Sequence, residues 1–185
     1  MRLLLLLSTL LLSGELFANS GERLQEANFA ATHELEQNSL ERKNQSVLTY
    51  LWADVYAAAF YAPAQASAHQ ALTKPLTQRL ELYYFRNIDR QDVIKAAWVT
   101  LERQHEAATL ERLRPHIDAL HATFRDIRPG DRYALNFNAG RGLTLEVNGQ
   151  AVFSSPDQEL ARAYLGIWLS PNGLSDKLRA SLLAD

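Results

Sequence analysis

The chain contains no cysteine, which excludes disulfide bonds, a thiol nucleophile and thiolate metal ligands. It also has no excess of positive charge, because 19 lysine and arginine residues are set against 21 aspartate and glutamate residues. A nucleic-acid-binding domain would be expected to carry a basic patch, so nucleic acid is not an expected partner. Stability must come from packing, and 185 residues are enough for one domain with a sizeable core.

Beyond its first residues the chain lacks any apolar run approaching the roughly twenty residues that a membrane-spanning helix needs. The run Leu3–Leu12 follows Arg2 and precedes the small residue Ala18, an arrangement typical of a cleavable signal peptide. As a helix this run would rise only about 15 Å, roughly half the hydrocarbon thickness of a bilayer. We therefore expect cleavage after Ala18 and a periplasmic or secreted protein without stable membrane insertion. An uncleaved anchoring helix is the alternative.

The division of the chain follows from this interpretation. We expect a signal peptide at residues 1–18, a polar and poorly ordered lead-in at residues 19–27, and one domain across residues 28–185. No internal repeat or low-complexity tract is visible beyond the leader, so a repeat architecture is not expected.

Three stretches have the composition or alternation of β-strands. Residues 46–61 are rich in aromatic and branched side chains on both parities, which predicts a central strand or strand pair covered on both faces. Residues 79–85 alternate in polarity and predict a strand with one better-buried face. Residues 133–153 predict a three-strand meander, because Asn148-Gly149 is typical of a type I′ hairpin turn.

Four helices are expected between and after these strands. Asp89 and Asp157 are suited to cap two of them, and a last helix should run from about Ser175 to Leu183. Two core-facing stripes have helical spacing: Val93, Ala96, Ala97, Thr100 and Leu101, then Leu110, Leu113, Ile117, Leu120 and Phe124. The order of strands, two helices, strands and two helices predicts an α+β domain with helices layered on a largely antiparallel sheet.

Several polar residues could carry chemistry, but a structural role is favoured for each. His116 and His121 lack the spacing of a metal site and are expected on the solvated surface. Arg86 could hold a carboxylate, although an ion pair with Asp89 or Asp92 is favoured. We expect no metal and no cofactor.

The aromatic and small-residue patterns are weighed in the same way. Tyr50, Trp52 and Tyr56 could line a ligand cleft or fill the core, and the core is favoured. Lys95 lies early in a helix, where a solvated position is favoured over a functional one. The serines lack a nucleophile elbow, and residues 140–142 fit a hairpin turn better than a phosphate loop.

Six short groups of residues occur in an order and spacing typical of a known family. They are Asp54–Tyr61, Tyr84–Ile88, Gly130–Tyr133, Gly142-Leu143 with Asn148-Gly149, Ile167–Leu169 and Leu178–Leu183. Together they resemble the chalcone isomerase-like family, especially its small bacterial members. The resemblance implies an open-faced β-sandwich, with a large antiparallel sheet covered by helices and a cleft between them for a flat or elongated apolar ligand. Its plant relatives divide into chalcone isomerases and fatty-acid-binding proteins.

The resemblance also indicates where a ligand would be contacted. Thr49 stands where the family has a ligand-contacting arginine, and a hydroxyl cannot form the paired hydrogen bonds of a guanidinium with a carboxylate. The isomerases place a tyrosine, a lysine and an asparagine on one helix face. Here only Lys95 coincides, Asp92 and Val99 fill the other two places, and Ile167 replaces a hydroxyl residue near the end. No catalytic residue is therefore assigned.

We predict a non-enzymatic, exported domain that binds a small amphipathic molecule such as a fatty acid, with Thr49, Tyr56 and Lys95 as ligand-binding residues. The first alternative is an intramolecular lyase or isomerase acting on an enone, with Lys95 and Tyr56 near the substrate. The second is an interaction module for another envelope protein, in which side chains fill the cleft. The oligomeric state does not follow from the sequence.

Overall fold

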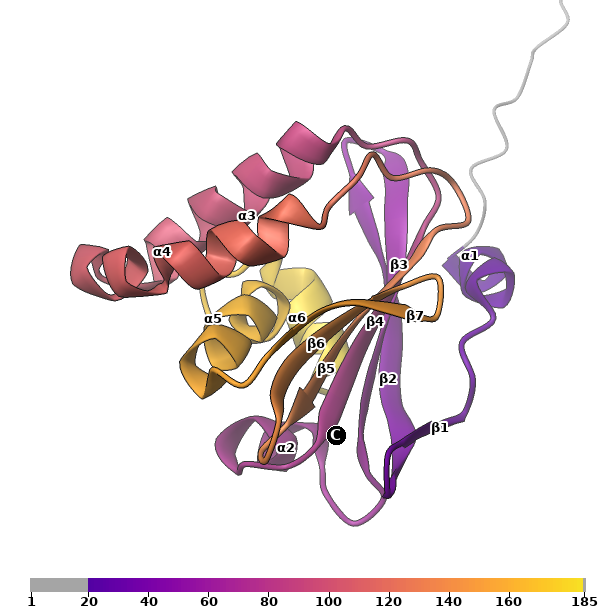
Figure 1. Cartoon of the computed structure of the whole chain (residues 1–185). Coiled ribbons are helices and arrows are strands. Elements are labelled where there is room, and N and C mark those ends of the chain that lie inside the picture. Colours follow the sequence, from indigo (N-terminus) through magenta and orange to yellow (C-terminus); the bar gives the residue numbers. More distant parts are fainter. Residues whose placement is uncertain (1–19, 185) are drawn as a thin grey trace, which may run out of the picture.

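One antiparallel sheet of seven strands organises the described part of the chain, residues 20–184 of the computed structural model (Figure 1). The expected signal peptide lies outside these residues. The strands are β1 (Thr32–Leu35), β2 (Asn38–Tyr50), β3 (Ala53–Pro63), β4 (Gln78–Tyr84), β5 (Arg132–Asn138), β6 (Gly142–Val147) and β7 (Gln150–Ser155). They lie side by side in chain order, each antiparallel to its neighbours.

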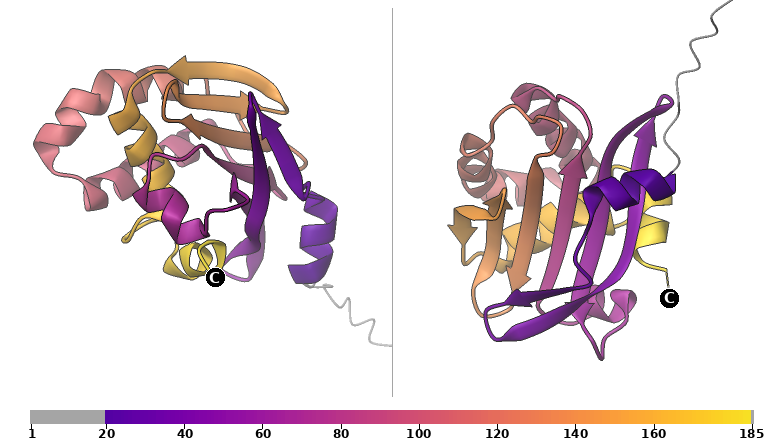
Figure 2. Two further views of the ribbon diagram at one scale, coloured as in Figure 1. Left: turned by 90° about the horizontal axis from the view of Figure 1, so that it is seen from below. Right: turned by 90° about the vertical axis from the view of Figure 1, so that its right-hand side faces the viewer.

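Helices cover both faces of this sheet. They are α1 (Ser20–Ala27), α2 (Ala68–Thr73), α3 (Arg90–Gln104), α4 (Ala107–Ala122), α5 (Gln158–Leu169) and α6 (Asp176–Leu182). Helices α2 to α6 share one large core with the sheet, and α1 lies across its opposite face (Figure 2). This arrangement confirms the predicted α+β sheet covered by helices. Within residues 20–184, no helix combines the length and apolar character needed to cross a membrane.

Strand β3 buries apolar side chains on both faces, as its composition predicted. Tyr56 and Phe60 belong to the large core under the helices, whereas Ala57 and Tyr61 belong to a second, smaller core on the opposite face. This parity follows from the pleat, which directs successive side chains to opposite sides. The predicted strand or strand pair is the β2–β3 hairpin.

Strand β4 also buries both faces, although its alternation predicted one better-buried face. Leu80 and Leu82 face the large core, while Arg79 and Glu81 are only 6% and 8% exposed on the opposite face. Buried charges are tolerated where they are paired. The polar half of the alternation therefore marks a buried charged layer rather than a solvated one.

That layer is a charge network formed by Arg79, Glu81, Arg132, Asn136 and Glu146. Arg79 donates from Nη1 to Glu146 Oε2 at 2.8 Å and to Asn136 Oδ1 at 2.9 Å. Its Nε lies 3.3 Å from Glu81 Oε2, and Arg132 Nη1 lies 2.7 Å from Glu81 Oε1. Asn136 Nδ2 donates to Glu146 Oε1 at 2.7 Å. The network ties β4, β5 and β6 together on the face that α1 covers.

Residues 20–27 form helix α1, which corrects the expectation of a poorly ordered lead-in. Ala27 is fully buried, Arg23 donates from Nε to Asp54 Oδ2 at 3.2 Å, and Arg132 donates from Nη2 to the Ala27 carbonyl. The Arg23 guanidinium also lies 4.7 Å from the Phe85 ring centroid. The composition misled because only Leu24 and Ala27 of this helix reach the second apolar core, and polar side chains such as Arg23 make further tertiary contacts.

The C-terminal half follows the local signals of the sequence closely. Asn148 and Gly149 have φ angles of 51° and 80°, as the predicted type I′ turn requires, and β5, β6 and β7 form the predicted meander. Asp157 caps α5 by accepting from the backbone N–H groups of Glu159 and Leu160. Asp89 is the N-cap of α3, although its side chain makes no capping bond.

Candidate functional site

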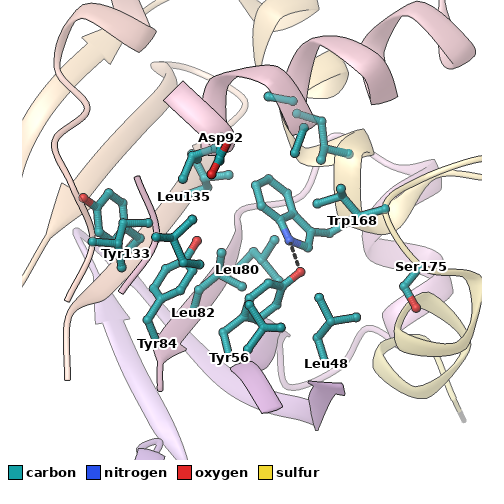
Figure 3. A pocket seen from close by; sticks show the side chains of 18 of the residues that line it. Leu48, Tyr56, Leu80, Leu82, Tyr84, Asp92, Tyr133, Leu135, Trp168 and Ser175 are labelled. Carbon is teal, nitrogen blue, oxygen red and sulfur yellow. Dashed lines mark hydrogen bonds between the residues drawn. The ribbon is translucent and has the colours of Figure 1, made fainter. Parts of the chain in front are cut away.

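An apolar cavity of about 640 Å³ lies between the sheet and the helices (Figure 3). Ordinary cores leave few voids larger than a water molecule, and ligand pockets typically measure about 300–1,000 Å³. The apolar lining consists of Leu48, Val55, Leu80, Leu82, Ile88, Val93, Ala96, Ala97, Phe124, Ile127, Leu135, Leu145, Ile167 and Leu174. Its size and lining make this cavity the candidate binding site.

The small side chains of α3 face this space. Ala96 and Ala97 line the cavity where the stripe of the helix meets the sheet, and Val93 lines it one turn earlier. A longer side chain at Ala97 would fill part of the cavity, because a packed interior has no other free volume to take it.

Aromatic residues supply most of the polar groups inside the cavity. Tyr56 Oη accepts a hydrogen bond from Trp168 Nε1 at 2.9 Å, and its ring meets the Tyr84 ring edge-on with centroids 5.4 Å apart. Burial raises the pKa of both Tyr56 and Tyr84 well above the ordinary value for tyrosine. Both phenols therefore stay protonated at physiological pH and can donate to a bound ligand.

The Tyr84 hydroxyl is the more available of the two. It points into the cavity (Figure 3), and no described protein group hydrogen-bonds to it within residues 20–184. The Tyr56 hydroxyl is oriented by Trp168, which leaves its own proton free to donate. The cavity thus presents two neutral hydroxyl donors on adjacent strands.

The lining residues Thr49, Tyr50, Asp92 and Ser175 are at least partly exposed, and together they are called the rim here. Thr49 Oγ1 donates to Asp54 Oδ1 at 2.7 Å, so its proton is already committed. Asp92, in the first turn of α3, is the single charged residue of the lining in the part of the chain that the structure describes.

Of the three predicted ligand-binding residues, the structure brings two to the cavity. Thr49 and Tyr56 line it, whereas Lys95 is exposed on α3 and is not part of the lining. Successive residues of an α-helix are about 100° apart, so Ala96 and Ala97 turn towards the sheet and Lys95 does not. The position that matched the family lysine therefore offers no charge inside the cavity.

The aromatic cluster proposed for the core divides in the same way. Tyr56 is buried, but Tyr50 and Trp52 are 67% and 80% exposed at the tip of the β2–β3 hairpin. The favoured core assignment is wrong for these two, because the chain turns at Leu51 and Trp52, whose φ angles are 45° and 67°. A turn within an apolar run left no glycine, asparagine or proline to reveal it.

His121 also departs from its expected place on the solvated surface. It is buried beside the cavity wall, with Nε2 3.0 Å from Tyr164 Oη, and it packs edge-on against Trp98. Burial lowers the pKa of His121 to about 4, so the ring is neutral at physiological pH. No set of three potential metal ligands gathers anywhere in residues 20–184.

Arg86 makes a different contact from the predicted ion pair with Asp89 or Asp92. Its Nε donates to the Asp54 carbonyl at 3.1 Å, which ties the end of β4 to the start of β3. Arg86 thus links two backbone segments near the cavity, and it is not a lining residue.

Sequence reasoning missed Tyr84 and Trp168 as site residues. Tyr84 shares the parity of Leu80 and Leu82, and Trp168 lies one turn after Tyr164, so both were detectable as core-facing. Nothing in that periodicity separates a side chain that fills a core from one that borders a cavity.

Comparisons with known proteins agree with this architecture. A family model described as chalcone isomerase-like matches residues 21–184. Among solved structures, a fatty-acid binding protein of Arabidopsis thaliana superposes with a TM-score of 0.61 at 16% identity, covering 84% of this chain and 90% of that protein. At this identity the likeness shows a shared fold. No curated protein matches the chain.

Proposed function

The chain belongs to the chalcone isomerase-like family, and from this premise we propose that it is an exported, non-enzymatic protein that binds a small amphipathic molecule in its cavity. The observation that carries the proposal is the apolar cavity of about 640 Å³ between sheet and helices. Burying an alkyl chain contributes about 0.8 kcal/mol per methylene, so a long chain in this space can reach micromolar affinity, worth about 8 kcal/mol.

The chemistry of the lining supports binding over catalysis. General acid–base catalysis is most effective when a group has a pKa near the working pH. Burial instead moves the pKa values of Tyr56 and Tyr84 away from that range, and Lys95 lies outside the cavity. The enone isomerase alternative thereby loses one of its two polar groups.

The fold supports a lipid-like ligand in general terms. The Arabidopsis thaliana protein with this fold is a fatty-acid binding protein. A fatty acid is therefore a member of the ligand class proposed for this chain. The interaction-module alternative required a cleft filled by side chains, and the open cavity argues against it.

Export rests on the leader. Its charged start, apolar run and small terminal residue Ala18 support cleavage and a periplasmic or secreted location. N-terminal sequencing of protein recovered from its own host tests this part, with Asn19 expected as the first residue. Recovery of the intact leader in a membrane fraction would overturn it.

The binding proposal is tested by filling the cavity. Native mass spectrometry should find a retained small molecule on the wild type, and calorimetric titration should show affinity rising with alkyl chain length. Ala97→Phe should abolish both, whereas Ala108→Phe, an equal change on the exposed surface of α4, should abolish neither. Absence of heat for every chain length with a folded wild type would sink the proposal. If the wild type turns over chalcone and Ala97→Phe abolishes this activity, the isomerase alternative would replace the binding proposal.

A further inference from the structure

The charges around the cavity favour one kind of ligand head group. Asp92 is the single charged lining residue in the described chain, and the lining contains no lysine, arginine or histidine there. Asp54, a second carboxylate, lies next to the rim through its 2.7 Å hydrogen bond with Thr49. Asp54 is neutralised by its ion pair with Arg23 at 3.2 Å, so Asp92 is the negative group that a ligand head would meet at the rim of this apolar cavity.

Three basic side chains near this end of the fold are held by protein groups, and a fourth, Lys95, lies on the outer side of α3. Arg86 donates to the Asp54 carbonyl, and Arg90 donates from Nη2 to the His121 carbonyl at 3.1 Å. Arg23 belongs to α1 on the opposite face of the sheet and donates to Asp54 Oδ2. None of the three lines the cavity.

Taking the proposed binding function as given, we infer that the natural ligand carries an uncharged, oxygen-bearing head, with a hydroxyl the best match. An ionised carboxylate entering this cavity would lose water without meeting an opposite charge, and would approach Asp92. An alcohol suffers neither penalty. The site is thus built for a neutral single-chain lipid rather than for a free fatty-acid anion.

The polar groups of the cavity complement such a head. The Tyr84 hydroxyl and the free proton of Tyr56 can donate to the ligand oxygen, and the Asp92 carboxylate can accept from the ligand O–H. A hydroxyl is both a donor and an acceptor, so it can satisfy both kinds of partner. A carboxylate can use the phenol donors alone.

Three ligands with the same alkyl chain separate head-group chemistry from chain burial. Dodecan-1-ol, dodecanoic acid and dodecylamine are titrated into the wild type at about pH 8, where the acid is ionised. The alcohol should bind at least about tenfold more tightly than the acid. Equal or tighter binding of the acid would overturn the inference, and so would an amine that binds about tenfold more tightly than the alcohol.

Two variants assign the preference to named groups. Asp92→Asn should reduce the difference in affinity between the alcohol and the acid, called the affinity gap, because it removes the repulsion between the rim and the anionic head. Asp89→Asn makes the same change of charge one residue before α3 but outside the lining, and should leave the affinity gap unchanged. Tyr84→Phe should weaken binding of the alcohol several-fold, because it removes a hydrogen-bond donor, while burial of the dodecyl chain still supports some binding. An affinity gap that neither Asp92→Asn nor Tyr84→Phe alters would overturn the assignment.

The failure of this inference differs from the failure of the proposed function. If the acid binds most tightly and Ala97→Phe abolishes that binding, the binding function stands and the neutral-head inference falls. If none of the three ligands binds a folded wild type, the binding function itself falls, and the inference with it.

Discussion

The two faces of the sheet are buried by opposite means. Under helices α2 to α6, apolar and aromatic side chains surround a cavity in which the polar groups point inward with few partners. Under α1, a small apolar core lies beside paired charges, which are joined by short bonds such as Arg79 to Glu146 at 2.8 Å. Directional bonds fix the strands on one face, which frees the other face to hold volume for a ligand.

Breaking the charge network should have the largest effect. Arg79→Leu leaves Glu81 and Glu146 without their shared cation, and removing one partner of a buried pair costs about 3–5 kcal/mol. Arg141→Leu removes a surface pair with Glu36 and should cost less than about 1 kcal/mol. Denaturant unfolding measures both. Similar losses for the two variants would contradict the idea that the network fixes this face.

Acid should test the cavity face next, through His121. Its pKa is about 4 in the folded protein and 6.5 in the unfolded chain, so above pH 6.5 both states are neutral and stability is complete. As the pH falls from 6.5 to 4, His121 becomes protonated in the unfolded state but stays neutral in the folded state. The free energy of unfolding therefore falls by up to about 3 kcal/mol.

The contribution of His121 is isolated by comparing variants. His121→Gln keeps a partner for Tyr164 but cannot titrate, so the free energy of unfolding should fall less steeply over this interval. His69→Gln, on the exposed surface of α2, serves as the control and should retain the wild-type slope. Identical slopes for all three proteins would refute the assignment to His121.

A matched pair of hydroxyl deletions compares the faces directly. Tyr56→Phe leaves Trp168 Nε1 without its partner in the cavity, and Tyr61→Phe removes the shorter of two hydrogen bonds to the Ala30 carbonyl on the opposite face. Each should lower the free energy of unfolding by about 1–2 kcal/mol. Only Tyr56→Phe should also change the affinity for a bound amphiphile. A change in affinity from Tyr61→Phe would show that the faces are not separate.

The hairpin tip belongs to neither face, and substitution there should have the smallest effect. Trp52 is 80% exposed at a φ of 67°, a region that bulky residues rarely adopt. Trp52→Gly should raise the free energy of unfolding by about 0.5 kcal/mol, because glycine adopts this φ without strain. Trp52→Ser keeps the backbone strain, so its free energy of unfolding should be lower than that of Trp52→Gly in the same experiment. The reverse order would contradict the strain.

The sequence predicted most of what depends on neighbouring residues. Asn148-Gly149 predicted its turn because positive φ is a local requirement, and the stripe through Leu113 and Ile117 predicted a core-facing helix because its period is local. Helix α1 escaped prediction because its contacts, such as Arg23 with Asp54, join residues far apart in the chain.

The site was predictable only in part, for a related reason. Thr49 was placed at the cavity by resemblance to a family. Lys95 failed because the resemblance put it on the ligand-facing side of α3, whereas the core-facing stripe through Val93 and Ala97 does not include it. The cavity itself is a space between strands and helices that no side chain fills. Its position depends on the sizes of side chains from five strands and two helices at once, and no single stretch of sequence records it.

The strand order of the sheet has a consequence for how the molecule assembles. Five of the six strand pairings join segments that are close in the chain, but β4 and β5 are separated by residues 85–131, which contain α3 and α4. The entropy lost on closing a loop grows with its length, so this pairing should be the slowest to form. Lining residues come from both sides of this junction, so the binding site cannot be complete before β4 and β5 pair.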